Sequence, residues 1–228
     1  MVGAVLVSHQ LLREGIGMTS RRTRERLLNR LQDQGINDEA VLETIVETPR
    51  HLFIDEALSH KAYEDTALPI GYNQTISQPY TVARMSELLL EFGAKDKVLE
   101  VGTGSGYQTA VLAQLCQQVF SVERILPLQE RAASVLGYLG LSNVSLFHTD
   151  GGMGLEHEAP FDAIMVTAAP TVIPESLKKQ LKVGGVLVAP VGDEEQKLVR
   201  ILRRSDSHFE TKVIEPVKFV PLLDGLVS

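Results

Sequence analysis

The chain has 228 residues, of which 44% are apolar and 22% charged, and these values suit one globular domain with a sizeable core. Acidic residues outnumber basic ones by 29 to 22, and the net charge of −7 argues against non-specific binding to nucleic acid. No apolar run is long enough to span a membrane, and a single cysteine cannot form an intramolecular disulfide. We therefore expect a cytoplasmic protein that holds no metal.

The organisation of the chain is predicted from changes in its pattern. Residues 1–17 begin with an apolar stretch but lack a clear basic start and cleavage site of a secretory signal, and we expect them to be an extension outside the domain. A single domain is expected over residues 18–228. Within it, residues 18–95 are expected to form a helical cap with an active-site loop, and residues 96–228 a cofactor-binding sheet with helices.

Helical periodicity dominates the first part of the domain. Leucines at helical spacing predict a helix over residues 23–34, and Asn37 is expected to cap a second helix that ends near Pro49. Residues 50–80 show no sustained period and are expected to form a loop with short turns, which at this length is usually functional. The apolar stripe returns over residues 81–92, which predicts a third helix.

From residue 97 the pattern changes to short apolar runs that alternate with helical segments. This alternation is typical of a parallel sheet covered by helices on both faces. Two late strands with little helix between them are expected to pair antiparallel at one side of that sheet. The predicted strands comprise residues 98–101, 119–122, 144–147, 163–166, 186–191, 198–202 and 211–220, and the predicted helices residues 107–115 and 127–139.

A glycine loop, Gly102-Thr103-Gly104-Ser105-Gly106, joins the first of these strands to the following helix. The dinucleotide fingerprint needs its third glycine one position later, where this chain has Tyr107. Glu100 lies just before the loop, where a carboxylate would repel a pyrophosphate but would suit the aminoacyl part of a cationic sulfonium cofactor. No Gly-Lys-Ser/Thr follows, which excludes a P-loop.

Two further carboxylates follow the next two strands. Glu123 could accept both ribose hydroxyls of a nucleoside, which fits NAD and S-adenosylmethionine equally, and Asp150 before Gly151 is also ordinary turn chemistry. Because the carboxyl ends of parallel strands meet at one edge, we expect both to converge with Glu100. The combination is similar to the class I S-adenosylmethionine-dependent methyltransferase fold, an α/β, Rossmann-like, doubly wound and mostly parallel sheet.

A polar segment over residues 69–80 leads into the third predicted helix. Ser77 or Gln78 could simply cap that helix, with Pro79 in its first turn. The segment holds more hydroxyls and amides than capping needs, and a helix N-terminus offers free N–H groups to an anion. We expect a carboxylate substrate to be held here.

Four motifs together resemble the protein-L-isoaspartate O-methyltransferase family, especially its bacterial members. They are QTISQP at residues 74–79, EVGTGSGYQTA at 100–110, FDAIMVTAAP at 161–170 and FVPL at 219–222. The resemblance extends from about Met18 to the C-terminus. The segment after Gly151 reads Gly-Met-Gly and the chain has no Trp, departures that touch none of the motif positions.

The resemblance implies an activity that composition cannot show. The family methylates the free carboxylate of L-isoaspartyl, and to a lesser extent D-aspartyl, residues in damaged proteins, with S-adenosylmethionine as donor. The methyl ester closes to a succinimide, which hydrolyses partly to normal aspartate. The implied partners are damaged proteins and peptides, not nucleic acid or a membrane, and the chain is expected to be a monomer.

The same resemblance implies the site residues. Ser77 occupies the position of the active-site serine. The expected cofactor-binding residues are Thr75, Ile76, Glu100, Gly102, Thr103, Gly104, Gly106, Glu123, Asp150 and Gly151. The expected substrate-binding residues are Gln78, Thr167, Val220, Pro221 and Leu222.

This chemistry needs no strong base. None of the six histidines lies within the cofactor motifs, and a carboxylate nucleophile with a pKa near 4 is already ionised at pH 7. Ser77 is therefore expected to orient the substrate by hydrogen bonding, not to act as a covalent nucleophile. The alternatives are another S-adenosylmethionine-dependent carboxyl or small-molecule methyltransferase, an NAD-dependent oxidoreductase and a non-catalytic cofactor-binding module.

Deleting residues 1–17 should leave folding and methyl transfer intact, because every motif lies after Met18. Thermal unfolding and activity measurements on the shortened chain check this expectation. A loss of more than ~1 kcal/mol in the free energy of unfolding would mean that the extension packs on the domain.

Overall fold

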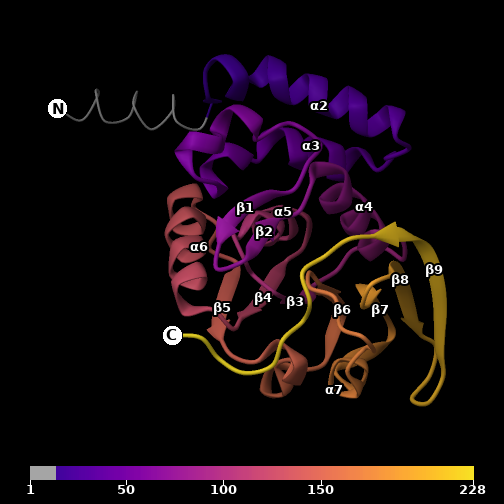
Figure 1. The fold of residues 1–228 in the computed structure, drawn as a ribbon. Helices are drawn as coiled ribbons and strands as arrows, with labels where there is room; N and C mark the ends of the chain where they lie inside the picture. The colour runs from indigo at the N-terminus through magenta and orange to yellow at the C-terminus, as the bar shows by residue number, and fades with distance from the viewer. Residues whose placement is uncertain (1–13) are drawn as a thin grey trace. The chain divides into compact units, whose positions relative to one another are not determined.

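A computed structural model describes residues 14–228 (Figure 1). The chain divides into two compact units, residues 1–84 and residues 85–228, which are described separately. The boundary falls inside helix α4 (Pro79–Leu90), because Met85, Leu88 and Leu89 belong to a core cluster of the second unit. The expected division of one domain at residue 95 stays a prediction. In residues 14–228, no helix is long and apolar enough to cross a membrane.

The first unit consists of helices, 3-10 turns and one β-hairpin. The helix predicted over residues 23–34 is confirmed as α2 (Arg21–Asp33), whose Leu27 and Leu31 are fully buried. The other elements of this unit are η1 (Gly17–Thr19), α3 (Glu39–Glu47), η2 (Arg50–Phe53), η3 (Glu56–Lys61), β1 (Leu68–Gly71) and β2 (Gln74–Ile76).

The predicted cap of the second helix is wrong by one residue. Asp38 is the N-cap of α3, and its carboxylate accepts a hydrogen bond from the Val41 N–H at 3.0 Å. The Asn37 amide instead donates to the Gly35 carbonyl at 2.8 Å, which closes the turn between the two helices. Asp and Asn cap about equally well, so position in the turn decides between them.

Residues 50–80 contain more regular structure than the predicted loop. Strands β1 and β2 pair antiparallel, with Leu68 opposite Ile76, and the two residues at the hairpin turn, Tyr72 and Asn73, both have positive φ. Two successive residues of positive φ match the right-handed twist of the flanking strands. The hairpin delivers the chain directly to Pro79, the first residue of α4.

Only the last residues of the expected extension lie among the described ones. The Glu14 carbonyl accepts a hydrogen bond from Nη2 of Arg24 at 2.8 Å, and Arg24 is a buried residue of α2. Residues 1–13 lie outside the described part, so the expectation for them stays a prediction. Residue 14 makes a contact that the deletion of residues 1–17 would remove.

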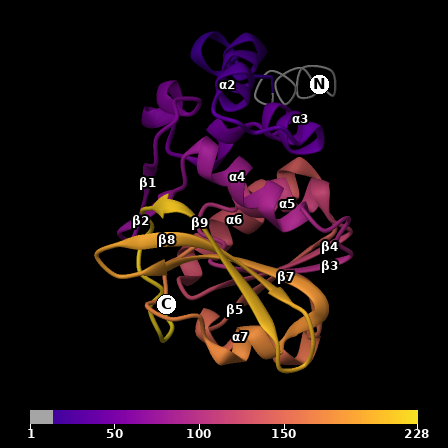
Figure 2. The same cartoon turned by 90° about the vertical axis from the view of Figure 1, so that its right-hand side faces the viewer.

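The second unit is a seven-stranded sheet with helices on both sides (Figure 2). The strand order is β5-β4-β3-β6-β7-β8-β9; the pairs from β5 to β7 are parallel, and β8 and β9 join antiparallel, as predicted. Figure 2 shows α5 and α6 on one side of the sheet and α7 on the other. The strands are β3 (Lys97–Val101), β4 (Gln118–Glu123), β5 (Val144–His148), β6 (Phe161–Val166), β7 (Leu181–Gly192), β8 (Gln196–Arg203) and β9 (Phe209–Val217). The helical elements are α5 (Tyr107–Leu115), α6 (Leu126–Leu139), η4 (Gly151–Met153), η5 (Glu156–Glu158) and α7 (Glu175–Lys179).

The central strands are mostly apolar because both faces of the sheet are covered. Val98 belongs to one core cluster and the next residue, Leu99, to the other, as the alternation of side chains along a strand requires. The cluster that contains Val98 also includes Leu112 of α5, and the cluster that contains Leu99 also includes Leu177 of α7. This double burial explains why the strands read as continuous apolar runs.

Glu100 interrupts this apolar pattern in the middle of β3. Its side chain is completely buried, and Oε2 accepts hydrogen bonds from the hydroxyls of Thr109 and Ser121, each at 2.5 Å. Within the described residues, Oε1 has no hydrogen-bond partner. Burial raises the pKa of Glu100 to about 7, the two hydroxyls oppose this, and the nearby Glu123 adds to it. The carboxyl group thus joins β3, β4 and α5 beneath the glycine loop.

Replacing Glu100 by Gln should change the pH dependence of stability. Because the folded pKa is about 7 and the ordinary value 4.5, the folded wild type holds a proton that the unfolded chain releases, so stability is lost as the pH rises through this window. Glu100→Gln does not titrate there. Relative to wild type, it should gain up to about 3 kcal/mol between pH 4.5 and pH 8.

Urea unfolding of both proteins at several pH values measures this difference. A difference in unfolding free energy that stays constant from pH 4.5 to pH 8 would show that Glu100 has an ordinary pKa in the folded protein.

Candidate functional site

The glycine loop leaves the carboxyl end of β3 with two backbone hydrogen bonds to its neighbour. The amides of Gly102 and Thr103 both donate to the Val122 carbonyl of β4, at 2.9 and 3.2 Å. Gly102 has a φ of 101°, and a Cβ at that position would lie 2.4 Å from the Thr167 hydroxyl oxygen. Thr167 needs this space, because its hydroxyl donates to the Val101 and Gly102 carbonyls. Glycine is therefore required here for conformation and for close approach.

Glu123, at the end of β4, is buried, and its carboxylate binds a backbone amide of the glycine loop. Oε2 accepts from the Gly104 N–H at 2.8 Å, and Oε1 accepts from the Ile125 N–H at 2.9 Å. Each carboxylate oxygen can accept more than one hydrogen bond, so both retain capacity for a hydroxyl donor. These two acceptors suit the vicinal hydroxyls of a ribose, and the residues of this loop therefore fit a nucleoside cofactor.

Asp150, after β5, has both oxygens engaged by backbone amides. Oδ1 accepts from the Gly152 N–H at 2.9 Å, and Oδ2 accepts from the Gly225 N–H at 2.7 Å. Its neighbour Gly151 sits so close to β3 that a Cβ would lie 2.5 Å from Cγ1 of Val101. Asp150 thus shapes the turn at the edge of the sheet and anchors the end of the chain.

Two residues expected to bind the cofactor point their side chains into the protein. The Thr103 hydroxyl lies 2.6 Å from that of Ser121 and is almost fully buried. Ser121 in turn donates to Glu100, so Thr103 and Glu100 belong to one buried network. Thr103 can offer a ligand only its backbone, and Glu100 supports the loop from inside. Gly106 continues the loop as the N-cap residue of α5.

The segment of residues 219–227 runs back along the carboxyl edge of the sheet, drawn in yellow in Figure 1. Its first residue exchanges hydrogen bonds with the Gln196 side chain, and Ala169 then bonds the Val220 carbonyl and the Leu222 amide, each at 2.8 Å. After Gly225 contacts Asp150, the Val227 amide donates to Arg124 at 2.8 Å. The C-terminal segment therefore contacts residues that follow β4, β5 and β6.

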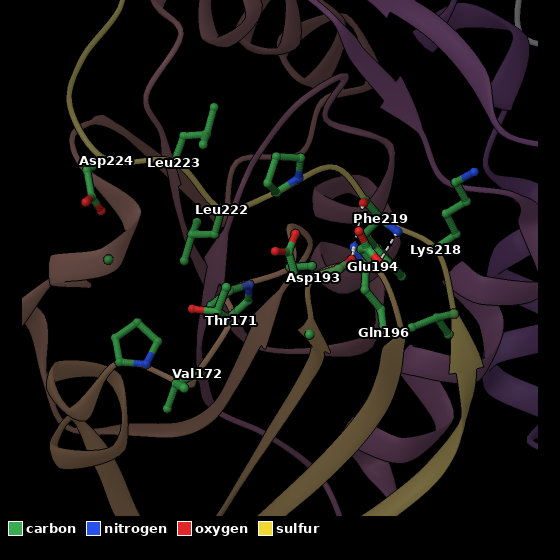
Figure 3. A pocket seen from close by; sticks show the side chains of 17 residues that line it. Thr171, Val172, Asp193, Glu194, Gln196, Lys218, Phe219, Leu222, Leu223 and Asp224 are labelled. Atoms are coloured by element: carbon green, nitrogen blue, oxygen red, sulfur yellow. Dashed lines mark hydrogen bonds between the residues drawn. The ribbon is translucent and has the colours of Figure 1, made fainter.

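The expected substrate residues of the second unit lie along this segment. Pro221 pairs with Ala169 in an isolated bridge, and Pro221 and Leu222 line a cavity of about 730 Å³ (Figure 3). Thr167 follows β6 next to the glycine loop. The structure thus brings Thr167, Val220, Pro221 and Leu222 to the same edge of the sheet as the glycine loop, Glu123 and Asp150.

The remaining expected residues lie in the first unit. Thr75 is exposed on β2 opposite Pro69, and Ile76 is buried. Ser77 and Gln78, both half-buried, connect the hairpin to α4.

The side chain that caps the N-terminus of α4 belongs to neither Ser77 nor Gln78. Asp65 accepts from the Tyr80 N–H at 2.9 Å through Oδ1, while its other oxygen accepts from Gln34 at 3.0 Å. The Gln78 carbonyl begins the helical ladder by accepting from Val82. Among the described residues, no hydrogen bond is found for the Ser77 hydroxyl.

Three contributing residues were absent from the sequence-based site. Asp65 lies far from Tyr80 in the sequence, and Gly225 far from Asp150, so no local spacing could indicate either pair. Ser121 did carry a signal, because it is a polar residue inside an apolar strand. Within residues 14–228, no group of His, Cys, Asp and Glu side chains could hold a metal ion.

Comparisons with known sequences identify the family of this chain. Residues 22–227 match the family model of protein-L-isoaspartate(D-aspartate) O-methyltransferase. Protein-L-isoaspartate O-methyltransferase 1 of Marinobacter nauticus is 61% identical over 214 residues, which are 94% of this chain and 97% of the relative. The protein-L-isoaspartate O-methyltransferase of Pseudomonas aeruginosa is 57% identical over 211 residues, 92% of this chain and all of the relative.

Solved structures give the same result. A protein-L-isoaspartate O-methyltransferase superposes with a TM-score of 0.79 at 28% identity, covering 90% of this chain and 67% of that one. A Plasmodium falciparum structure described under the same name, in complex with S-adenosyl-L-homocysteine, gives a TM-score of 0.76 at 26% identity and covers 88% and 98%. The chain has the class I methyltransferase fold and belongs to the protein-L-isoaspartate(D-aspartate) O-methyltransferase family.

Proposed function

We propose that this chain is a protein repair enzyme that transfers the methyl group of S-adenosylmethionine to the free carboxylate of L-isoaspartyl, and less readily D-aspartyl, residues of damaged proteins. The observation that carries the proposal is the family match over residues 22–227, which includes both the segment around Ser77 and the glycine loop. The geometry of the loop and Glu123 supports it, because their donors and acceptors suit a nucleoside.

The cofactor would lie over the glycine loop at the end of β3. Glu123 would accept the ribose hydroxyls, while Gly102, Gly104 and Gly106 would let the backbone approach the cofactor. Asp150 and Gly151 would border the adenine, and Thr75 and Ile76 would lie beside the cofactor. When bound, S-adenosylmethionine supplies an electrophilic methyl group on a positively charged sulfur.

The protein's task is then positioning. The isoaspartyl carboxylate is ionised at neutral pH and needs no base, so the residues around it have to hold it close to the methyl group and exclude water. Ser77 would hydrogen-bond this carboxylate and fix its angle of approach. Gln78, Thr167 and residues 220–222 would hold the surrounding peptide.

We also propose that the chain acts in the cytoplasm as a monomer. Cys116, the single cysteine, is free and buried, and a free thiol suits a reducing compartment. Light scattering coupled to size-exclusion chromatography measures the oligomeric state.

The activity is tested with two peptides that differ only in containing isoaspartate or aspartate at one position. Transfer of labelled methyl from S-adenosylmethionine to the isoaspartyl peptide is expected, with little transfer to the other. Equal methylation of both, or of neither, would contradict the proposal and favour another carboxyl or small-molecule substrate.

Glu123→Ala should weaken binding of S-adenosylhomocysteine roughly ten- to a hundred-fold. The reason is the loss of a charged acceptor for two hydroxyls, since hydrogen bonds to charged groups contribute about 1.5–3 kcal/mol. The Gly104 and Ile125 amides also lose their acceptor, so the melting temperature should fall. Titration calorimetry at a temperature where both proteins are folded measures the affinity, and a value within twofold of wild type would remove Glu123 from the site.

Ser77→Ala should lower turnover far more than cofactor affinity, because a small misorientation of the nucleophile costs on the order of a hundred-fold in rate. Its melting temperature should change little, since Asp65 supplies the cap of α4. Asp65→Ala is the contrasting variant and should lose about 1 kcal/mol of stability. Rates with saturating isoaspartyl peptide and melting curves of both variants separate the two roles. Wild-type turnover by Ser77→Ala would exclude a catalytic role for this hydroxyl.

A further inference from the structure

One half of the sheet's carboxyl edge contains a cavity that none of the expected cofactor-binding residues lines. It has a volume of about 730 Å³ and lies where Ala169–Pro170 follow β6, where β7 ends at Gly192 and where β8 begins at Gln196 (Figure 3). Residues 217–219 and 221–224 line it on the remaining side. All of these residues belong to the second unit.

The strand order assigns this cavity to the methyl acceptor's side. The expected cofactor residues follow β3, β4 and β5, whereas most of the cavity lies at β6, β7 and β8 and only Gly152, after β5, borders it from the other half. The order reverses between β3 and β6. In open α/β sheets, ligands bind at such a switch point. A donor over β3 to β5 leaves the β6 to β8 half for the acceptor. The cavity also contains Pro221 and Leu222, which the proposed function places against the substrate peptide.

The lining combines apolar walls with an excess of negative charge. Val172 and Leu223 are large apolar side chains that are 74% and 47% exposed, so both offer apolar surface to a ligand in the cavity. Three carboxylates, those of Asp193, Glu194 and Asp224, line the same cavity.

One ammonium group, that of Lys218, also lines the cavity, and Figure 3 shows it pointing away from Asp193. Within residues 14–228, none of the three carboxylates forms an ion pair with a basic side chain. The excess negative charge is therefore available to a cationic group of a ligand.

We propose that this cavity receives a side chain that flanks the isoaspartyl residue, and that it favours lysine or arginine. These side chains have an apolar stem and a charged head, so the stem can lie against Val172 and Leu223 while the head meets Asp193 and Glu194. A flanking acidic residue would be repelled by the same carboxylates. The inference rests on the proposed function and adds a preference for sequence context.

The preference should be moderate, because the carboxylates are exposed and partly screened by salt. We expect the KM for a peptide with flanking lysine to be about three- to tenfold lower than for one with flanking glutamate, with glutamine between them. The value of kcat should be nearly equal for the three peptides, because the cavity does not contact the reacting carboxylate. The KM spread should shrink as the ionic strength rises.

The experiment uses the full chain and isoaspartyl peptides that carry lysine, glutamine or glutamate either before or after the isoaspartyl residue. The test variants are Glu194→Gln and the double variant Asp193→Asn with Glu194→Gln. The control is Asp206→Asn, which removes one negative charge from a residue that is 94% exposed beyond the opposite end of β8. Melting temperatures of all variants confirm that they fold.

The double variant should abolish most of the KM spread, Glu194→Gln should reduce it, and Asp206→Asn should retain it. A wild type without any spread, or a double variant that keeps the wild-type spread, would overturn the inference. The glutamine peptide separates this outcome from failure of the proposed function, because its methylation depends on the isoaspartyl group alone. If no peptide is methylated, the proposed function fails and this inference fails with it.

Discussion

The central constraint of this structure is that β3 is paired in parallel on both sides. Backbone groups at its carboxyl end bond to both neighbours, because the Gly102 amide donates to Val122 of β4 and the Val101 carbonyl accepts from Thr167, which follows β6. The chain after β3 therefore has to leave the sheet between two fixed neighbours. Glycine at position 102 permits this exit, since a side chain would collide with Thr167. The exit places the glycine loop at the carboxyl edge of the sheet, where the proposed function puts the cofactor.

The C-terminal segment connects the two halves of this edge. Its Gly225 amide donates to Asp150, which follows β5, and its Leu222 amide donates to the Ala169 carbonyl, which follows β6. The two contacts lie within a few residues of one another, so one short stretch of chain holds both. Asp150 is thereby connected through this stretch to Ala169, although within the described residues it accepts hydrogen bonds only from backbone amides.

Much of the fold could be predicted from the sequence, because it depends on local pattern. The continuous apolar strands, the helices and the antiparallel end of the sheet all follow from periodicity, and the glycine loop follows from spacing. The hairpin before α4 could not be predicted in this way. Its turn is built from Tyr72 and Asn73, and tyrosine at positive φ carries no turn signal.

The site was predictable as a set of positions but not as a set of contacts. The motifs place Thr103 in the glycine loop and Glu100 just before it. Whether either side chain points to a ligand or to the interior depends on its neighbours in three dimensions. Ser121 decides this for both, because its hydroxyl lies between them. The cap from Asp65 is equally non-local, and it changes what the Ser77 hydroxyl is free to do.

The acidic residues at this edge stabilise the loops around them, and the proposed function gives the same residues a second role toward the ligand. Glu123 and Asp150 each accept two backbone N–H groups of loops that have no secondary-structure partner, and such groups are costly to leave unsatisfied. In the proposed function, the same negative charge would attract a cationic sulfonium but repel the carboxylate that has to react with it. A cationic side chain next to the isoaspartyl residue would offset this repulsion at the acceptor's half of the edge. Asp193 and Glu194 therefore extend to the substrate peptide an electrostatic arrangement that the cofactor half already requires.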